Sequence, residues 1–94
     1  MQKFIVELVS VFTPRDLPEE YQQFVDFKAN IENKEVKETD KIAVLRVKDT
    51  TSYHILFLDD YKSMDEIDKE VEETLDGQIY NFNIRKILEG HING

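Results

Sequence analysis

Two segments of this chain carry apolar side chains on both faces of an extended pattern, and this feature constrains the fold most. In residues 3–12 the alternation gives two apolar sets on opposite faces, Phe4, Val6 and Leu8 against Ile5, Val9 and Val11. Residues 53–58 (YHILFL) are apolar on both faces in the same way. A strand of this kind needs cover on both sides, which is typical of the middle of a sheet. We therefore predict a sheet in which both segments are central strands.

A helix is predicted after the first strand. Asp16 is its expected N-cap, Pro18 lies in the first turn, and the helix runs from about Leu17 to a point near residues 24–31. That last stretch also fits a strand, because four apolar residues alternate with polar ones: Val25, Phe27, Ala29 and Ile31. The sequence leaves both interpretations open.

A β-hairpin is predicted next. Residues 41–48 (KIAVLRVK) and residues 53–58 are two apolar runs separated by the polar turn 49–52 (DTTS). The mixed-charge stretch 33–41 that precedes them has no apolar period and is predicted to be a loop.

The best-marked helix follows the hairpin. Ser63 is its N-cap and Glu66 completes a capping box. An apolar stripe at helical spacing follows, formed by Met64, Ile67, Val71 and Leu75. Gly77 stands where a helix C-cap is expected. A last strand is predicted from Gln78, since Tyr80, Phe82 and Ile84 alternate with polar residues.

These elements give the order strand, helix, strand, strand, helix, strand. The order predicts one α+β domain over residues 1–94, with a ferredoxin-like βαββαβ arrangement and a frayed tail at about 90–94. We expect a four- or five-stranded, mostly antiparallel sheet with its helices on one face. The other face then needs cover, and the simplest cover is a second copy of the chain, so we expect a homodimer through the open sheet face or a sheet edge.

The overall charge limits the partners. The chain has 12 basic and 20 acidic residues and a formal charge of −8. Binding to phosphate-rich surfaces uses basic patches, so we expect no direct nucleic-acid or membrane binding. The absence of cysteine argues against disulfides and zinc fingers, and no apolar run has the length of a membrane span. We expect an intracellular protein that binds a basic protein surface, including that of a nucleic-acid-binding protein.

Nearly all of the charge imbalance lies in residues 59–76, which hold nine acidic residues and two lysines, a net charge of −7. On a helix, like charges four residues apart are destabilising, as at Glu66/Glu70 and Asp68/Glu72. One hypothesis is an acidic docking surface for a basic partner, formed by Asp65, Asp68, Glu72, Glu73 and Asp76. The alternatives are a solvated helix face and a site for calcium or another hard cation, although no D-x-D-x-D-G loop is present.

Few residues predict catalysis. Asp59 and Asp60 directly follow a predicted strand, where Mg²⁺-dependent enzymes place carboxylates, so they are the alternative metal site. His54 and His91 stand alone, without a metal-ligand spacing, and no glycine-rich phosphate loop exists. We expect no cofactor and no enzymatic activity. The competing hypothesis is a metal-dependent hydrolase or a small-ligand regulatory domain.

In outline the chain resembles two families. The small dimeric ferredoxin-like nucleases of CRISPR systems end their first strand with an acidic residue, whereas Val11, Phe12 and Thr13 stand there in this chain. The chain also resembles small acidic viral inhibitors, such as the anti-CRISPR proteins of archaeal rod-shaped viruses that target type I-D effectors. This resemblance lies in size, lack of cysteine, element order and the acidic run 65–76. It implies an inhibitor, located in the host cytoplasm, that imitates nucleic acid and occupies a basic groove.

Overall fold

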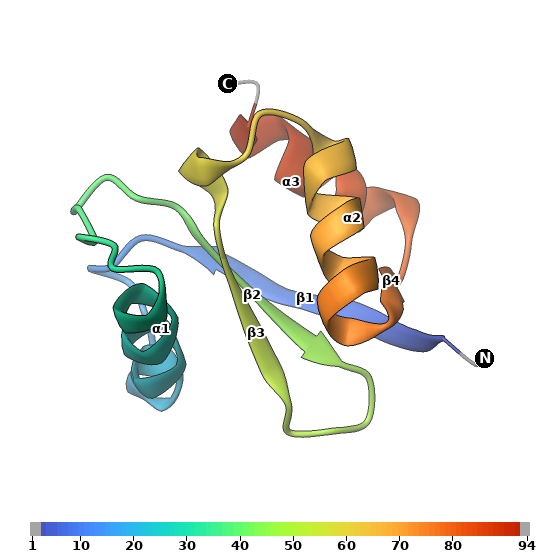
Figure 1. The fold of residues 1–94 in the computed structure, drawn as a ribbon, viewed down its shortest axis with the longest axis horizontal. Coiled ribbons are helices and arrows are strands. Elements are labelled where there is room, and N and C mark those ends of the chain that lie inside the picture. The colour runs from blue at the N-terminus through green and yellow to red at the C-terminus, as the bar shows by residue number, and fades with distance from the viewer. Residues whose placement is uncertain (1–2, 93–94) are drawn as a thin grey trace.

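The computed structural model describes residues 3–92, which form a four-stranded curled sheet with three α-helices and one short 3-10 turn (Figure 1). In chain order the elements are β1 (Phe4–Phe12), α1 (Glu19–Ile31), β2 (Ile42–Val47), β3 (Tyr53–Phe57), the turn η1 (Leu58–Asp60), α2 (Met64–Leu75), β4 (Gly77–Ile79) and α3 (Phe82–Ile92). The predicted α+β class, the βαββαβ order and the mostly antiparallel sheet are confirmed. In class and element order the structure is compatible with a ferredoxin-like α+β fold to which α3 is added.

The strand order is β3-β2-β1-β4, with antiparallel pairing of β1 with β2 and of β2 with β3, and parallel pairing of β1 with β4. The central strands are therefore β1 and β2, and the prediction that residues 53–58 form a central strand was wrong. These residues are nevertheless buried on both faces, because helices cover both faces of the sheet. A strand at the edge of a doubly covered sheet needs the same apolar pattern as a central strand.

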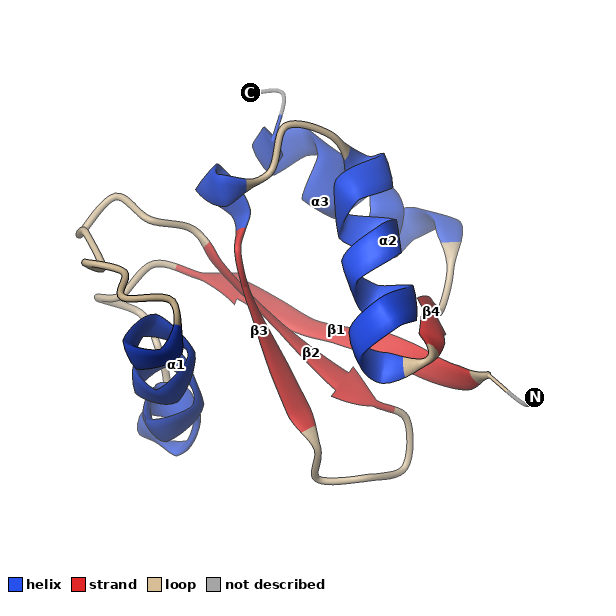
Figure 2. Ribbon diagram, viewed as in Figure 1, coloured by secondary structure: helices blue, strands red, loops and turns tan. Residues whose placement is uncertain are grey.

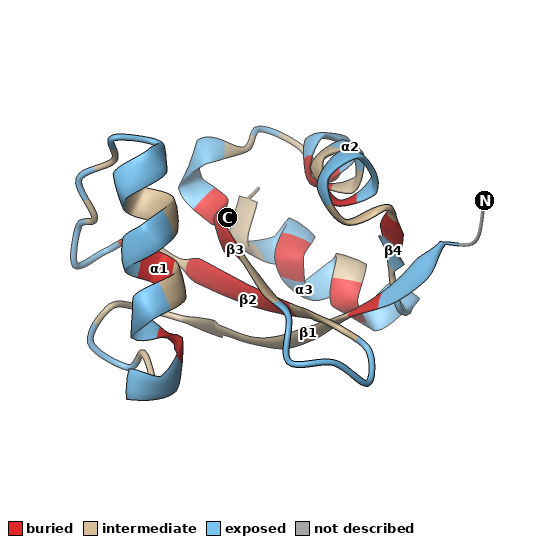
Figure 3. Ribbon diagram, turned by 60° about the horizontal axis from the view of Figure 1, so that its bottom comes forward, coloured by how far each residue is buried: buried red, intermediate tan, exposed pale blue. Residues whose placement is uncertain are grey.

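The helices lie on opposite faces, α1 on one and α2 with α3 on the other (Figures 1 and 2). Consecutive residues of β2 accordingly enter different cores: Ile42 and Val44 pack with Val25 of α1, whereas Ala43 and Leu45 pack toward α2 and α3. Figure 3 shows buried positions along β2 and on each of the three α-helices. The prediction that the helices share one face was wrong. The uncovered face that motivated the predicted dimer is absent from residues 3–92.

A β-bulge in β1 changes the predicted faces of this strand. Leu8 is paired with Leu45 and Ser10 with Val44, so one extra residue lies between them. A bulge shifts the alternation beyond it. Val11 therefore lies on the same side as Leu8, with the α2–α3 core, and Val9 lies with the α1 core. Val9 and Val11 were predicted to share a face, and that prediction was wrong.

Residues 25–31, which the sequence left open between helix and strand, belong to the helix α1. Pro18 takes the N-cap position, and the predicted cap Asp16 instead accepts a hydrogen bond from the Thr13 hydroxyl at 3.2 Å. The cap of α2 is confirmed, since the Ser63 hydroxyl accepts a hydrogen bond from the backbone N–H of Glu66. The predicted hairpin is also confirmed by β2 and β3.

The C-terminal region differs most from its prediction. The strand that begins near Gln78 ends at Ile79, and residues 82–92 form a helix instead of a strand. The Asn81 side chain accepts a hydrogen bond from the N–H of Ile84 at 3.1 Å, and Ile84 and Leu88, one turn apart, are buried. The tail predicted to fray belongs to this helix as far as residue 92, and its last two residues lie outside the described part of the chain.

Gly77 does not cap α2 in the predicted way. Asp76 takes the left-handed conformation at the helix end, with φ of 48°, and Gly77 is the first residue of β4. A Cβ atom on Gly77 would lie 2.7 Å from Cγ2 of Val6 and 2.9 Å from the carbonyl oxygen of Phe4. Glycine at this position thus permits the close approach of β4 to β1.

Candidate functional site

The five carboxylates predicted as one partner-binding array face different parts of the structure. Asp68 forms an ion pair with Arg85 of α3, and Glu72 binds Lys3 with 2.8 Å between Nζ and Oε1. Both contacts lie on the flank of α2 that faces β4 and α3, next to a hollow lined by these four residues. Cations from other elements therefore balance part of the predicted array.

The other three predicted carboxylates are more available. Asp76 ends the helix, and its backbone N–H donates to the carbonyl oxygen of Glu72 at 3.1 Å. Asp65 and Glu73 are exposed, and no basic group of residues 3–92 lies within ion-pair distance of either carboxylate. The freely available part of the predicted surface is therefore smaller than the sequence indicated.

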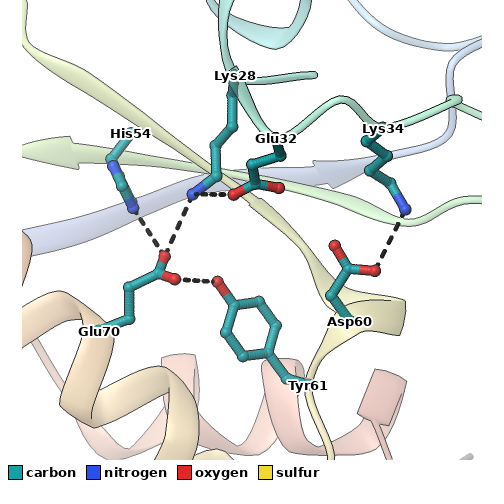
Figure 4. Close-up of polar contacts among 7 residues, drawn as sticks. All are labelled: Lys28, Glu32, Lys34, His54, Asp60, Tyr61 and Glu70. Atoms are coloured by element: carbon teal, nitrogen blue, oxygen red, sulfur yellow. Dashed lines mark hydrogen bonds and ion pairs between the residues drawn. The ribbon is translucent and has the colours of Figure 1, made fainter. Parts of the chain in front are cut away.

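Glu70, on the opposite flank of α2, is the centre of a polar network (Figure 4). Its carboxylate lies 3.0 Å from His54 Nε2 of β3, 2.5 Å from the Tyr61 hydroxyl and 3.3 Å from Lys28 Nζ of α1. Lys28 also lies 3.6 Å from Glu32. The network links α1 and α2, which lie on opposite faces of the sheet, around the edge strand β3.

The network fixes the protonation states at neutral pH. Burial alone would raise the pKa of Glu70, but hydrogen bonds from His54 and Tyr61, together with the Lys28 charge, lower this pKa from 4.5 to about 2. Burial and the hydrogen bond to Glu70 raise the pKa of Tyr61 above 10. Near neutral pH Glu70 is therefore an ionised acceptor and Tyr61 a neutral donor. Neither group is poised for proton transfer, so the network is suited to binding and positioning.

Beside this network a groove runs between the two helices along the edge of β3. Its volume is about 450 Å³. One wall is α1, with Phe24, Phe27 and Ile31, and the other is α2, with Glu70 and Thr74. Tyr53, His54 and Ile55 of β3 lie between the walls, where Lys28 and Glu32 also contribute. We call these ten residues the β3 groove. Phe27 and Ile31 are 68% and 67% exposed, so the α1 wall presents apolar surface to solvent.

The β3 groove continues into a second depression on α2, which shares Glu70 and Thr74 with it. This depression is open to solvent, measures about 470 Å³ and is otherwise lined by Asp60, Tyr61, Glu66, Lys69 and Glu73. We call it the acidic hollow. It contains four carboxylates and one ammonium group, so it is suited to cationic side chains.

The two carboxylates of the alternative metal site lie directly after β3. Asp59 and Asp60 are exposed in η1, and Asp60 lies 3.2 Å from Lys34 Nζ. Within residues 3–92 no group of three or more histidine, aspartate or glutamate side chains could hold a metal ion. His54 is engaged with Glu70. His91 is partly buried, and burial and nearby Lys41 lower its pKa below 6.5 despite the opposing effect of Asp59.

In the sequence Glu70 is one of nine acidic residues in the segment 59–76, and Phe27 and Ile31 were not predicted to form a site. A signal was present for each. Glu70 lies three positions after Ile67 and directly before Val71, so it borders the apolar stripe of α2. A carboxylate at such a partly buried position needs hydrogen bonds or an ion pair. Phe27 and Ile31 are one helical turn apart and are not part of the buried stripe that contains Tyr21 and Val25.

The chain matches a protein family over residues 4–92, and that family is described as "Domain of unknown function (DUF749)". The chain belongs to this family. A relative is the "Uncharacterized protein MJ0858" of Methanocaldococcus jannaschii, which is 30% identical over 91 residues, covering 96% of this chain and 79% of the relative. A solved structure, that of MTH1880 from Methanobacterium thermoautotrophicum, is 51% identical with a TM-score of 0.39 and covers 86% of this chain and 90% of that one.

The DUF749 match extends from β1 to α3 and so includes both walls of the β3 groove, the Glu70 network and the acidic hollow. All of these features therefore belong to the DUF749 unit itself. Within residues 3–92 none of its helices combines the length and the apolar character needed to cross a membrane.

Proposed function

We propose that this DUF749 protein is an acidic protein-interaction module that binds a basic surface of a partner protein. The observation that carries the proposal is the acidic hollow, which is lined by four carboxylates and the ammonium group of Lys69. Asp60 and Glu70 are paired with Lys34 and Lys28, whereas Glu66 and Glu73 have no ion-pair partner among residues 3–92. A concave surface lined by one sign of charge concentrates its field and attracts oppositely charged groups. It also favours fast association that weakens with salt.

The pairing pattern of α2 supports this assignment. The carboxylates that border the sheet, Asp68 and Glu70, are each balanced by a cation from another element. Asp65 and Glu73 lie further out, and the described residues give neither of them an ion-pair partner. Lys69 is four positions from each of them on the helix, but its ammonium group lies within ion-pair distance of neither carboxylate. A basic partner would supply that contact.

The test is capture of binding partners from a lysate of the source cells by wild type and by the double variant Asp65→Asn/Glu73→Gln. A matched control, Glu19→Gln/Glu20→Gln, removes the same charge from two exposed residues in the first turn of α1. Each exposed charge pair is worth about 0.2–1 kcal/mol, so the double variant should bind a captured partner about two- to thirtyfold more weakly. The α1 control should bind it as wild type does.

The salt dependence completes the test. Raising the salt from about 0.05 M to about 0.3 M shortens the Debye length and should weaken wild-type binding more than binding by the double variant. Equal retention by wild type and the double variant at both salt concentrations would contradict the proposal. A narrower form of this function, a virus-encoded inhibitor of a CRISPR-type complex, stays a prediction. So does the homodimer.

A further inference from the structure

The β3 strand has an open side. It is the end strand of the sheet, and among residues 3–92 it pairs with β2 alone. In this antiparallel ladder the N–H of Leu58 donates to the carbonyl of Lys41 at 2.9 Å, and that of Val47 donates to the carbonyl of Ser52 at 3.2 Å. Hydrogen-bonded pairs alternate along such a ladder. The backbone groups of Tyr53 and Ile55 therefore point away from β2, into the β3 groove.

The two sides of this edge differ in chemistry. Ile55 points to the face covered by α1, and Leu56 points to the face covered by α2. A strand added to β3 would continue the same alternation, because successive side chains of a strand point to opposite faces. Every second side chain would then meet the exposed apolar wall formed by Phe27 and Ile31. The side chains between them would meet the α2 wall and the acidic hollow beside it.

We propose that the β3 groove binds an extended segment of a partner protein, in which large apolar residues alternate with lysine or arginine, as an added strand along β3. The lysine or arginine residues of this segment rest on the proposed function. Its apolar residues and its extended conformation rest on the groove. The Lys28–Glu70 ion pair joins the two walls, so the segment has to displace it. Lys28 can move without losing its charge partner, because Glu32 lies 3.6 Å from its ammonium group.

Charge selects a different protein over a second copy of this chain. Two copies joined edge to edge would pair β3 with β3, and residues 49–61 contain no lysine or arginine. The same stretch carries Asp49, Asp59 and Asp60, and each copy has a net charge of −8. A second copy would therefore bring carboxylates to an acidic hollow, and a basic segment would bring the complementary charge.

The experiment uses the full chain and a fluorescent peptide of about nine residues in which lysine and valine alternate, enough for one strand. The first control peptide has the same composition with all lysines before all valines. The second is the alternating peptide with N-methyl groups along its strand edge, which removes backbone donors. Fluorescence anisotropy should show saturable binding of the alternating peptide, at least about tenfold tighter than binding of either control.

Two protein variants test the groove. Phe27→Asp/Ile31→Asp changes exposed side chains and should weaken binding at least about tenfold while the circular dichroism spectrum stays that of wild type. The matched control is Phe82→Asp on α3, because Phe82 is 68% exposed, as Phe27 is, and lies outside the groove. It should bind as wild type does.

The outcomes separate the two proposals. Equal binding of alternating and block peptides, or no effect of Phe27→Asp/Ile31→Asp, overturns the groove, and loss of binding in Asp65→Asn/Glu73→Gln then still upholds the acidic module. Loss of binding in the groove variant without any effect of salt or of Asp65→Asn/Glu73→Gln upholds the groove and overturns the acidic module. A dimer in sedimentation that the groove variant dissociates would identify a second copy as the occupant and overturn the partner segment.

Discussion

Replacing Glu70 by glutamine tests the network that joins the two walls of the groove. The carboxylate accepts from His54, Tyr61 and Lys28, and these contacts lower its pKa from 4.5 to about 2 although burial opposes the shift. A tenfold change in proton affinity corresponds to about 1.4 kcal/mol. The ionised form is therefore stabilised in the folded chain by about 3 kcal/mol relative to the unfolded chain. Glu70→Gln should lose most of this, about 2–3 kcal/mol near neutral pH.

The pH dependence gives the sharper result. Below pH 4.5 the unfolded chain takes up a proton at this glutamate before the folded chain does, so the stabilisation is complete above that pH and is lost as the pH falls toward about 2. The stability difference between wild type and Glu70→Gln should thus shrink to less than about 1 kcal/mol at the acid end. Urea unfolding followed by circular dichroism, from about pH 6 to about pH 2.5, measures both proteins under identical conditions.

Two further variants make the Glu70 assay specific. Glu73→Gln neutralises an exposed carboxylate of the same helix and should change stability by less than about 0.5 kcal/mol at every pH. Tyr61→Phe removes one of the three donors and should move the acid loss of stability to higher pH. A wild-type advantage over Glu70→Gln that stays constant across the pH range would refute the argument, because it would place the stabilisation in packing instead of in the charge of Glu70.

Four further substitutions test how the fold holds the site. Gly77→Ala should destabilise by about 1–3 kcal/mol in urea unfolding, because the new methyl group meets Val6 and the Phe4 carbonyl, whereas Gly90→Ala, with nothing within 4 Å, should stabilise α3 by about 0.5–1 kcal/mol. Asp76→Gly should raise the melting temperature, since glycine takes the φ of 48° without strain, a gain of about 0.5–1 kcal/mol. Arg85→Ala should cost no more than about 1 kcal/mol, because Arg85 and Asp68 are each more than one-third exposed, and a larger loss would show a buried role.

The elements that the sequence predicted correctly have local signals. The Ser63 cap, the α2 stripe and the β2–β3 hairpin each depend on residues within a few positions of one another. The last helix was missed because Tyr80, Phe82 and Ile84 satisfy a strand alternation. The helical spacing of Ile84 and Leu88, with Asn81 as a cap, is the pattern that folding selects, since it buries both residues against α2.

The faces of the sheet depend on information that is not local. A strand that is apolar on both faces records that two layers cover it, but not whether it has one neighbouring strand or two. For residues 53–57 the structure has two layers and one neighbour. The Glu70 network has the same character, since its partners lie 16, 9 and 42 positions away in the chain. No periodicity within a single segment can predict such contacts.

The uncertainty between helix and strand for residues 25–31 has its cause in the β3 groove. Residues 25–31 fit both a helix and a strand because apolar residues occur on two sides of α1. Val25 and Ala29 pack on the sheet, and Phe27 and Ile31 face solvent at the β3 groove. A helix that only has to cover the sheet needs the first pair alone, and the second pair leaves apolar surface exposed without stabilising the isolated chain. Phe27 and Ile31 thus made the helix hard to recognise in the sequence, and among residues 3–92 of the folded chain they pack against no other part of the core. A bound partner segment would bury them.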